Sequence, residues 1–132
     1  MNNMKVLLVD DDVFLRDMYA TKFVECGHQV EAVDQGGKAL SILAKEKDFD
    51  VVLVDMVMPG MTGVELIAKI EEEKLFNGAT CIVLSNQGQQ ADIDEAMEAG
   101  AKSYIVKAEH LPSEVVEKVE NILKDSSSGK DK

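Results

Sequence analysis

Polar side chains end several short apolar runs of this chain, and their types could bind a metal ion and an oxyanion. The residues concerned are Asp10, Asp11, Asp55, Ser85 and Lys107. The clearest run is Val51–Val54, which leads into Asp55 and is stopped by Pro59 and Gly60. A short apolar run bounded by turn signals is typical of a strand buried on both faces. In an open α/β sheet, sites lie at the carboxyl ends of such strands.

Three carboxylates gathered at one sheet edge repel one another. Two unit charges about 4 Å apart interact by about 4 kcal/mol at an effective dielectric constant of about 20, so Asp10, Asp11 and Asp55 together require a cation. Open coordination by carboxylate oxygens suits Mg²⁺ or Mn²⁺ and does not suit zinc. Lys107 adds a positive charge that a metal alone does not require, and Ser85 adds a hydroxyl donor. A metal, an ammonium and a hydroxyl that converge on one carboxylate fit a phosphoryl group that arrives later.

The elements that must position these side chains alternate between strand and helix. Strands are predicted at Lys5–Val9, Gln29–Val33, Val51–Val54, Thr80–Leu84 and Lys102–Val106. After each strand, apolar residues recur at offsets of three and four, which predicts a helix. The inner faces of these helices are Leu15/Met18/Tyr19/Phe23/Cys26, Leu40/Leu43/Ala44, Gly63/Leu66/Ile67/Ile70, Ile93/Ala96/Met97 and Val115/Val116/Val119/Ile122/Leu123. This alternation predicts right-handed crossovers and a parallel sheet with helices on both faces.

Composition limits the classes of function. The 132 residues are 45% hydrophobic and 30% charged, which is typical of a globular domain. The formal net charge of −11 argues against direct binding to nucleic acid, because neutralising phosphates needs a basic surface. No segment approaches the ~20 apolar residues of a membrane span, and the N-terminus does not resemble a signal peptide, so a cytoplasmic protein is expected. Cys26 and Cys81 lack metal-site spacing and are expected to be reduced core thiols.

One domain is expected over residues 1–124. Residues 125–132 combine serine, glycine and charged side chains and are expected to form a flexible tail or a linker stub. The domain then either acts through protein contacts alone or is the N-terminal part of a longer protein.

Several motifs in register make this sequence resemble a receiver domain of the two-component response-regulator family, with similarity to the chemotaxis response regulators. The resemblance covers about Lys5 to Leu123. The matching residues are Val9-Asp10-Asp11 with Arg16, the segment Asp55-Met56-Val57-Met58-Pro59-Gly60-Met61-Thr62-Gly63, and Ser85, Tyr104 and Lys107. The last three follow Asp55 by 30, 49 and 52 positions (85 − 55, 104 − 55 and 107 − 55).

The resemblance implies a flavodoxin-like (βα)5 fold of three layers with strand order 2-1-3-4-5. It also implies that Asp55 receives a phosphoryl group from the phosphohistidine of a sensor histidine kinase or a histidine phosphotransfer protein. Asp11, Asp55 and the backbone carbonyl of Val57 would bind Mg²⁺, or Mn²⁺, with Asp10 nearby or acting through water. Such a domain is a phosphoacceptor that assists its own phosphorylation and slow dephosphorylation, and it is not an enzyme.

The same resemblance implies a switch made of three residues. Ser85 and Lys107 would each bind a phosphoryl oxygen, and Tyr104 would report the change. The affected surface would be the fourth helix, fifth strand and fifth helix, which we expect to bind a downstream protein or a second copy of the chain. The chain would then be a monomer or a phosphorylation-dependent dimer. The fourth helix has the thinnest apolar stripe, so it should shift most easily.

Some positions depart from the usual family pattern. Proline with a cis bond usually follows the lysine, but Ala108 follows Lys107 here. A cis bond before a non-proline residue costs about 3 kcal/mol, so the sequence leaves this loop geometry open. Asn86 stands where a small residue is usual and could narrow access to the aspartate or bind the phosphoryl group. In this family, the side chains two positions after the aspartate and two after the hydroxyl residue flank the path of an attacking water, and here they would be Val57 and Gln87. Valine can neither donate nor accept, which predicts a long-lived aspartyl phosphate.

Other interpretations of these residues remain open. A lone aspartate at a strand end is more often a helix cap, and Asp12 is expected to be an N-cap. A Mg²⁺-dependent phosphatase of the haloacid dehalogenase type also uses a strand-end aspartate, but it needs a second acid where Val57 stands. A flavodoxin-like cofactor binder needs a phosphate-binding loop after the first strand, where this chain has three acids. A receiver-like scaffold that acts without phosphorylation would most simply lack an acid, the hydroxyl or the lysine, and none is missing.

Overall fold

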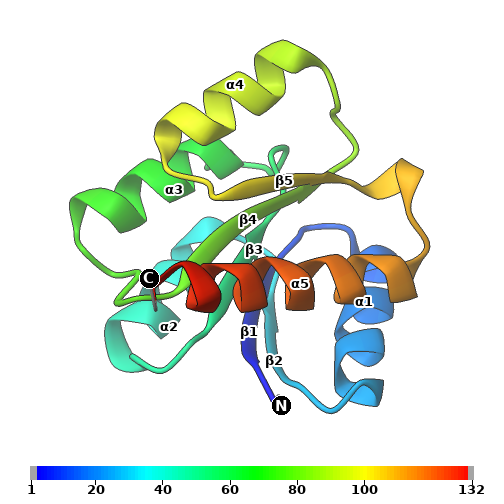
Figure 1. Cartoon of the computed structure of the whole chain (residues 1–132). Helices are drawn as coiled ribbons and strands as arrows, with labels where there is room; N and C mark the ends of the chain where they lie inside the picture. Colours follow the sequence, from blue (N-terminus) through cyan, green and yellow to red (C-terminus); the bar gives the residue numbers. More distant parts are fainter. Residues whose placement is uncertain (1–2, 131–132) are drawn as a thin grey trace.

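The computed structural model describes residues 3–130, in which strands and helices alternate. The strands are β1 (Lys5–Val9), β2 (Gln29–Val33), β3 (Val51–Val54), β4 (Thr80–Ser85) and β5 (Ser103–Val106). The helices are α1 (Val13–Glu25), α2 (Gly36–Lys45), α3 (Gly63–Glu72), α4 (Gln90–Ala99) and α5 (Pro112–Lys130), with a 3-10 turn η1 at Lys107–Glu109. Neighbouring strands all pair in parallel, in the order β2-β1-β3-β4-β5 (Figure 1). The expected flavodoxin-like α/β fold is therefore confirmed.

Alternating side chains of the sheet build two cores. On β1, Leu7 and Val9 belong to one core, whereas Val6 and Leu8 belong to the other. Helices α2, α3 and α4 cover the first face of the sheet, and α1 and α5 lie side by side on the second (Figure 1). Because both faces are covered, the central strands are apolar throughout, and every residue of β3 is buried. The polar residues that follow these strands are thereby collected at the carboxyl edge of the sheet.

Capping groups fix the two helices that begin beside this edge. Asp12 accepts a hydrogen bond from the backbone N–H three residues later at 3.1 Å, so its expected role as the N-cap of α1 is confirmed. Thr62 and Glu65 form a capping box at the start of α3. Gly63 lets that start approach the sheet closely, because a Cβ atom there would overlap the carbonyl oxygen of Asp55.

Four side chains lie elsewhere than their sequence patterns predict. Met18 of α1, Ala44 of α2 and Met97 of α4 are exposed, whereas all three were assigned to inner faces. Successive helix residues differ by about 100° in direction, so when Ala96 faces the sheet directly, Met97 turns away from it. Cys81 is buried as expected, but Cys26 is exposed because it is the C-cap of α1 and not part of its inner face.

Helix α5 continues past the predicted end of the domain at residue 124. It begins at Pro112, as expected, and remains helical through Lys130, so the backbone of residues 125–130 is helical and not irregular. That residues 125–132 are a tail or linker stub outside the domain stays a prediction, and residues 131–132 lie outside the described residues. Among the helices described here, α5 included, none has the length and apolarity needed to cross a membrane.

The loop after β5 has a geometry that the sequence left open. Within residues 3–130 there is no cis peptide bond, so the bond between Lys107 and Ala108 is trans. The chain then forms the 3-10 turn η1, closed by a hydrogen bond from the backbone N–H of His110 to the Lys107 carbonyl at 3.3 Å. This turn brings the Lys107 side chain back over the edge of the sheet, where it is buried.

Candidate functional site

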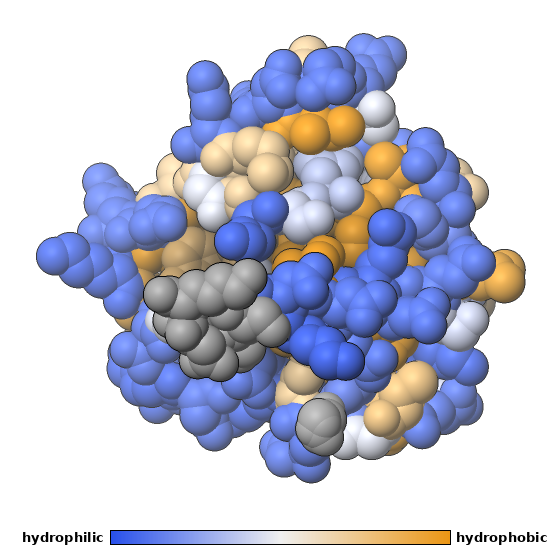
Figure 2. Space-filling view, in the orientation of Figure 1, coloured by the Kyte–Doolittle hydropathy of each residue, from blue (hydrophilic) through white to orange (hydrophobic). Residues whose placement is uncertain are grey.

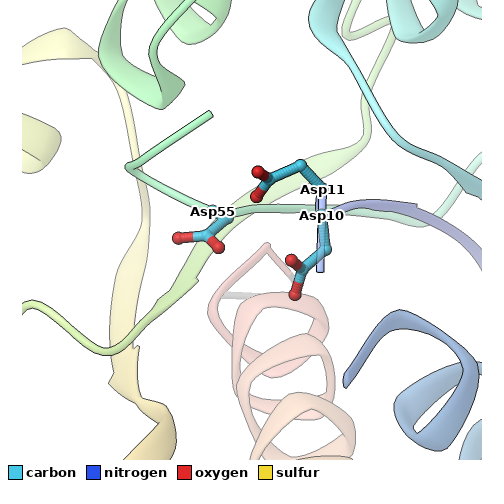
Figure 3. A group of neighbouring side chains, drawn as sticks. All are labelled: Asp10, Asp11 and Asp55. Atoms are coloured by element: carbon cyan, nitrogen blue, oxygen red, sulfur yellow. The ribbon is translucent and has the colours of Figure 1, made fainter. Parts of the chain in front are cut away.

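The carboxyl ends of β1 and β3 bring three aspartates together. The backbone N–H of Asp55 donates to the Val9 carbonyl at 3.0 Å, and that of Asp10 donates to Val33 at 3.1 Å, so ladder bonds fix both strand ends. One carboxylate oxygen from each of Asp10, Asp11 and Asp55 lies within 4.8 Å of the others. In Figure 3 the Asp10 and Asp11 side chains leave the end of β1 on opposite sides, with Asp55 beside them.

The three acids differ in exposure. Asp10 is 1% exposed and Asp55 is 8% exposed, whereas Asp11 lies at the surface. A cluster of carboxylate oxygens with one open side fits a hard divalent cation that keeps some of its water. The chemistry of this donor set therefore agrees with an Mg²⁺-type ion and disfavours zinc, for which sulfur or nitrogen ligands are usual.

Lys107 lies between two of these acids. Its Nζ is 2.6 Å from an Asp10 oxygen and 3.1 Å from an Asp55 oxygen, and its side chain is 4% exposed. Burial by itself would lower the pKa of Lys107, but the hydrogen bond that Lys107 donates to Asp10 and the charge of Asp55 outweigh burial and raise that pKa. The ammonium is therefore charged at neutral pH, as an anion-binding group must be.

Asp10 is held on both of its oxygens. One accepts from the backbone N–H of Asp12 at 3.0 Å, and the other accepts from Lys107. Burial raises the pKa of Asp10, while Lys107 and the Asp12 N–H act in the opposite direction. Asp55 is less engaged, because its second oxygen meets only the Val57 N–H, at 3.3 Å. Asp11 and Asp55 are thus the more available carboxylates.

Ser85 at the end of β4 and Tyr104 on β5 both bind the backbone of Gln87, in the loop that leads from β4 to α4. Ser85 is 1% exposed, and its Oγ accepts from the backbone N–H of Gln87 at 3.3 Å. The Tyr104 hydroxyl donates to the carbonyl oxygen of the same Gln87 at 2.5 Å. Burial raises the pKa of Tyr104, so this hydroxyl stays protonated and able to donate. A single peptide segment therefore connects the hydroxyl next to the acids with an aromatic side chain of β5.

The predicted modulators lie on the rim. Val57 is 55% exposed, and Asn86 and Gln87 are exposed on the β4–α4 loop. None of these three side chains makes a hydrogen bond among residues 3–130; the bonds at Val57 and Gln87 come from the backbone. All three are thus free to face an incoming molecule.

Two structural features of the site were not assigned a role from the sequence. Arg16 donates from Nη1 to the carbonyl oxygen of Asp10 at 2.9 Å, and Gly63 allows α3 to start against the backbone of Asp55. The signal for the first was an arginine near the start of a helix that follows three acids. The signal for the second was a glycine on the inner face of a predicted helix, but spacing alone does not show that the position approaches backbone atoms.

Comparison with known proteins agrees with this geometry. The pattern described as the response regulator receiver domain matches residues 6–120. The chain is 38% identical over 120 residues to the chemotaxis protein CheY of Thermotoga maritima, covering 91% of this chain and 98% of that protein. It is 34% identical over 121 residues to a chemotaxis protein CheY homolog of Campylobacter jejuni, covering 91% of this chain and 92% of that protein.

Solved structures show the same similarity in three dimensions. A CheY-like response regulator receiver domain protein from Methanospirillum hungatei superposes with a TM-score of 0.85 at 27% identity, covering 97% of this chain and 99% of that one. The chemotaxis response regulator CheY4 of Vibrio cholerae superposes with a TM-score of 0.83 at 26% identity, covering 92% and 99%.

Proposed function

This chain belongs to the response regulator receiver family, and from that premise we propose that Asp55 is its phosphoacceptor. The donor is the phosphohistidine of a sensor histidine kinase or of a histidine phosphotransfer protein. The observation that carries the proposal is the buried Lys107, whose Nζ lies 3.1 Å from Asp55 and 2.6 Å from Asp10. Because a buried ion pair adds little net stability, anion binding accounts for this arrangement better than a structural role does.

The proposed reaction is a phosphoryl transfer between two side chains. An Asp55 carboxylate oxygen attacks phosphorus, a P–O bond forms, and the P–N bond to the donor imidazole breaks. The imidazole leaves with the electron pair of that bond and takes up a proton from solvent. Lys107 then donates to one phosphoryl oxygen and the Ser85 hydroxyl donates to another, as charge-assisted hydrogen bonds. Both donors already lie at the sheet edge, so little reorganisation is needed.

The acidic cluster supports a divalent ion in this reaction. Asp11, Asp55 and the backbone carbonyl of Val57 would hold Mg²⁺, or Mn²⁺, with Asp10 nearby or acting through water. The ion would offset the negative charge of the carboxylates and of the phosphoryl oxygens. The hydrogen bonds to the Asp10 oxygens, at 2.6 and 3.0 Å, are shorter than those to the Asp55 oxygens, at 3.1 and 3.3 Å, which favours an indirect role for Asp10.

In this proposal the protein is modified itself and does not act on a separate substrate. It assists its own phosphorylation and the slow hydrolysis of the aspartyl phosphate. The alternative of a Mg²⁺-dependent phosphatase is disfavoured because Val57, where that class needs an acid, presents an exposed apolar side chain. We place the chain in the cytoplasm, where ATP is available to a kinase that would supply the phosphohistidine.

The output surface in this proposal is the face made by α4, β5 and α5. Figure 2 shows hydrophobic and weakly polar side chains reaching the surface between the mainly hydrophilic outer sides of α4 and α5. Helix α4 buries a single residue, Ala96, among those described, and leaves Met97 44% exposed. Such thin anchorage lets the helix shift when the Gln87 segment moves. The partner is a downstream protein or a second copy of the chain, so the protein is a monomer or a phosphorylation-dependent dimer.

One experiment separates this function from its alternatives. The chain is incubated with Mg²⁺ and acetyl phosphate, and the intact protein is weighed. We expect the gain of one phosphoryl group, labile to acid and base and lost in Asp55→Asn. A label that persists in Asp55→Asn contradicts the phosphoacceptor assignment, and no label at all in the wild type favours a receiver-like scaffold.

A further inference from the structure

Arg16 breaks a local preference at the start of α1. It lies in the first turns of this helix, where a positive side chain opposes the helix dipole. The first turn itself holds no acidic residue, and the acid next to it, the N-cap Asp12, binds the backbone N–H of Leu15 and not the guanidinium. Residues that violate local preferences are concentrated at functional sites, so the contacts of this arginine are informative.

The contact that Arg16 makes is with the backbone of the site and not with its acids. Its Nη1 donates to the carbonyl oxygen of Asp10 at 2.9 Å, in a partly buried position. Among the side chains of residues 3–125, no carboxylate oxygen lies within 4.0 Å of the guanidinium, whereas Lys107 pairs with Asp10 and Asp55. Arg16 is therefore not the counter-ion of the cluster, and its effect must pass through the Asp10 carbonyl.

That carbonyl belongs to the peptide that connects Asp10 to Asp11. Because a peptide is planar, a fixed oxygen also fixes the direction of the next N–H and Cα. Asp10 is held at its N–H by Val33 at 3.1 Å and at its carboxylate by Lys107. The Asp11 side chain, in contrast, makes no hydrogen bond within the part of the chain that the structure describes, so its direction is set by this backbone.

We propose that Arg16 is a positioning residue for the divalent ion. It holds the peptide between Asp10 and Asp11 so that the Asp11 carboxylate stays beside Asp55. The inference rests on the proposed function, since it requires that Asp11 and Asp55 hold the ion. Side chains that orient metal ligands from outside commonly change metal affinity by about 10- to 100-fold.

A purely electrostatic role for Arg16 predicts the opposite sign. A guanidinium close to three carboxylates repels an arriving divalent cation, so removal of its charge should tighten binding. If Arg16 positions Asp11, removal of its donors should weaken binding even though the repulsion is relieved. The direction of the change therefore distinguishes the two roles without any measurement of phosphorylation.

The test measures Mn²⁺ binding to the full chain by electron paramagnetic resonance of the free ion. Arg16→Met keeps the aliphatic stem but removes every donor, and Arg16→Lys keeps the charge and an N–H donor. Lys22→Met is the matched control, because it removes one positive charge from the same helix at a residue whose ion pair is with Glu25, at 3.5 Å, and not with the site. We expect Arg16→Met to bind about 10-fold more weakly than the wild type, Arg16→Lys to lie between them, and the control to be unchanged.

Two results would contradict the positioning role of Arg16. Equal or tighter Mn²⁺ binding by Arg16→Met, or weaker binding by Arg16→Lys than by Arg16→Met, overturns the positioning role. Thermal unfolding without metal checks that each variant folds, and if Arg16→Met does not fold, Arg16→Leu, which also removes the charge and every donor, gives the same test of sign. A wild-type chain that fails to bind Mn²⁺ overturns the proposed function and this inference with it, whereas normal binding by both wild type and Arg16→Met overturns the inference alone.

Discussion

At the scale of single residues, the site divides its acids by how firmly each is held. Asp10 is buried and bonded through its N–H, its carbonyl and both carboxylate oxygens. Asp55 is buried but has one oxygen only weakly engaged, and Asp11 is exposed. Asp10 thus holds the Lys107 ammonium in place, while Asp55 and Asp11 remain available to bind ligands.

Asp11→Ala tests whether Asp11 is a ligand of the divalent ion. We expect phosphorylation by acetyl phosphate to fall by more than about 100-fold, beyond the 10- to 100-fold loss typical of residues outside the first coordination shell. The fold should persist, and the melting temperature should rise by roughly 2–5 °C because carboxylate repulsion is relieved. Mass spectrometry and thermal unfolding without Mg²⁺ measure the two effects. Normal labelling of Asp11→Ala contradicts its role as a ligand.

In the proposed function, Val57 would control a second residue-level property, the lifetime of the aspartyl phosphate. Its side chain is 55% exposed on the rim and offers no hydrogen bond to an attacking water. Asn at this position can hold that water, and one hydrogen bond contributes about 1 kcal/mol, so Val57→Asn should lose phosphate about five times faster. Decay of the acid-labile phosphate measures the rate, with Val57→Leu as the apolar control. Unchanged or slower loss in Val57→Asn argues that Gln87 controls the water instead.

At the scale of elements, the site depends on how closely α3 starts beside β3. The capping box of Thr62 and Glu65 fixes the first turn of α3, and the Gly63 N–H donates to the Met56 carbonyl at 3.0 Å. A Cβ atom at position 63 would lie 2.8 Å from the Met56 Cα and would also overlap the Asp55 carbonyl. Because those neighbours are backbone atoms, they cannot move aside as a flexible side chain would.

Gly63→Ala should therefore destabilise the protein and displace the Asp55 loop. We expect a loss of about 1–3 kcal/mol in the free energy of unfolding, as is usual for overpacking. The matched control is Gly37→Ala in α2, where the nearest atom lies 3.8 Å from the added Cβ and helix propensity predicts a gain of up to about 1 kcal/mol. Urea unfolding measures both. A Gly63→Ala variant as stable as the wild type shows that the loop relaxes without strain.

At the scale of the whole molecule, one loop connects Ser85 at the site with Tyr104 on β5. Gln87 receives Tyr104 at its carbonyl and contacts Ser85 through its N–H. If the phosphoryl group draws the Ser85 hydroxyl towards Asp55, as we propose, the bond to Gln87 changes, and with it the support of α4. Such a change would be driven by tighter binding of the phosphoryl group to Ser85 and Lys107 in one arrangement than in the other.

Amide chemical shifts with and without beryllofluoride, a phosphoryl mimic, test this coupling. We expect changes at the Asp55 loop and throughout residues 86–108, because the β4–α4 loop, α4 and β5 move together. Tyr104→Phe removes the hydroxyl that binds Gln87 and should reduce the changes in α4 without affecting those at Asp55. Shifts confined to the Asp55 loop mean that the signal leaves the site by another route.

The sequence by itself determined the fold and the edge at which the site lies. Strands buried on both faces have continuous apolar sequences such as Val51–Val54. Because the strands are parallel, the polar residues that end them all lie at the same edge of the sheet. Helix existence followed from spacing, and Asp12 was identified as a cap. These features are local or periodic, so they can be read along the chain.

The tertiary structure decided which groups touch. The pairing of Lys107 with Asp10 as well as Asp55 depends on the trans bond and 3-10 turn after β5, which no local pattern specifies. Arg16 donates to the backbone carbonyl of Asp10. Every residue has such a carbonyl, so the order of side chains does not indicate which one an arginine binds. Met97 faces solvent because the neighbouring Ala96 is the residue that packs against the sheet. Contacts between elements fix rotation and approach, and those depend on packing that brings distant segments together.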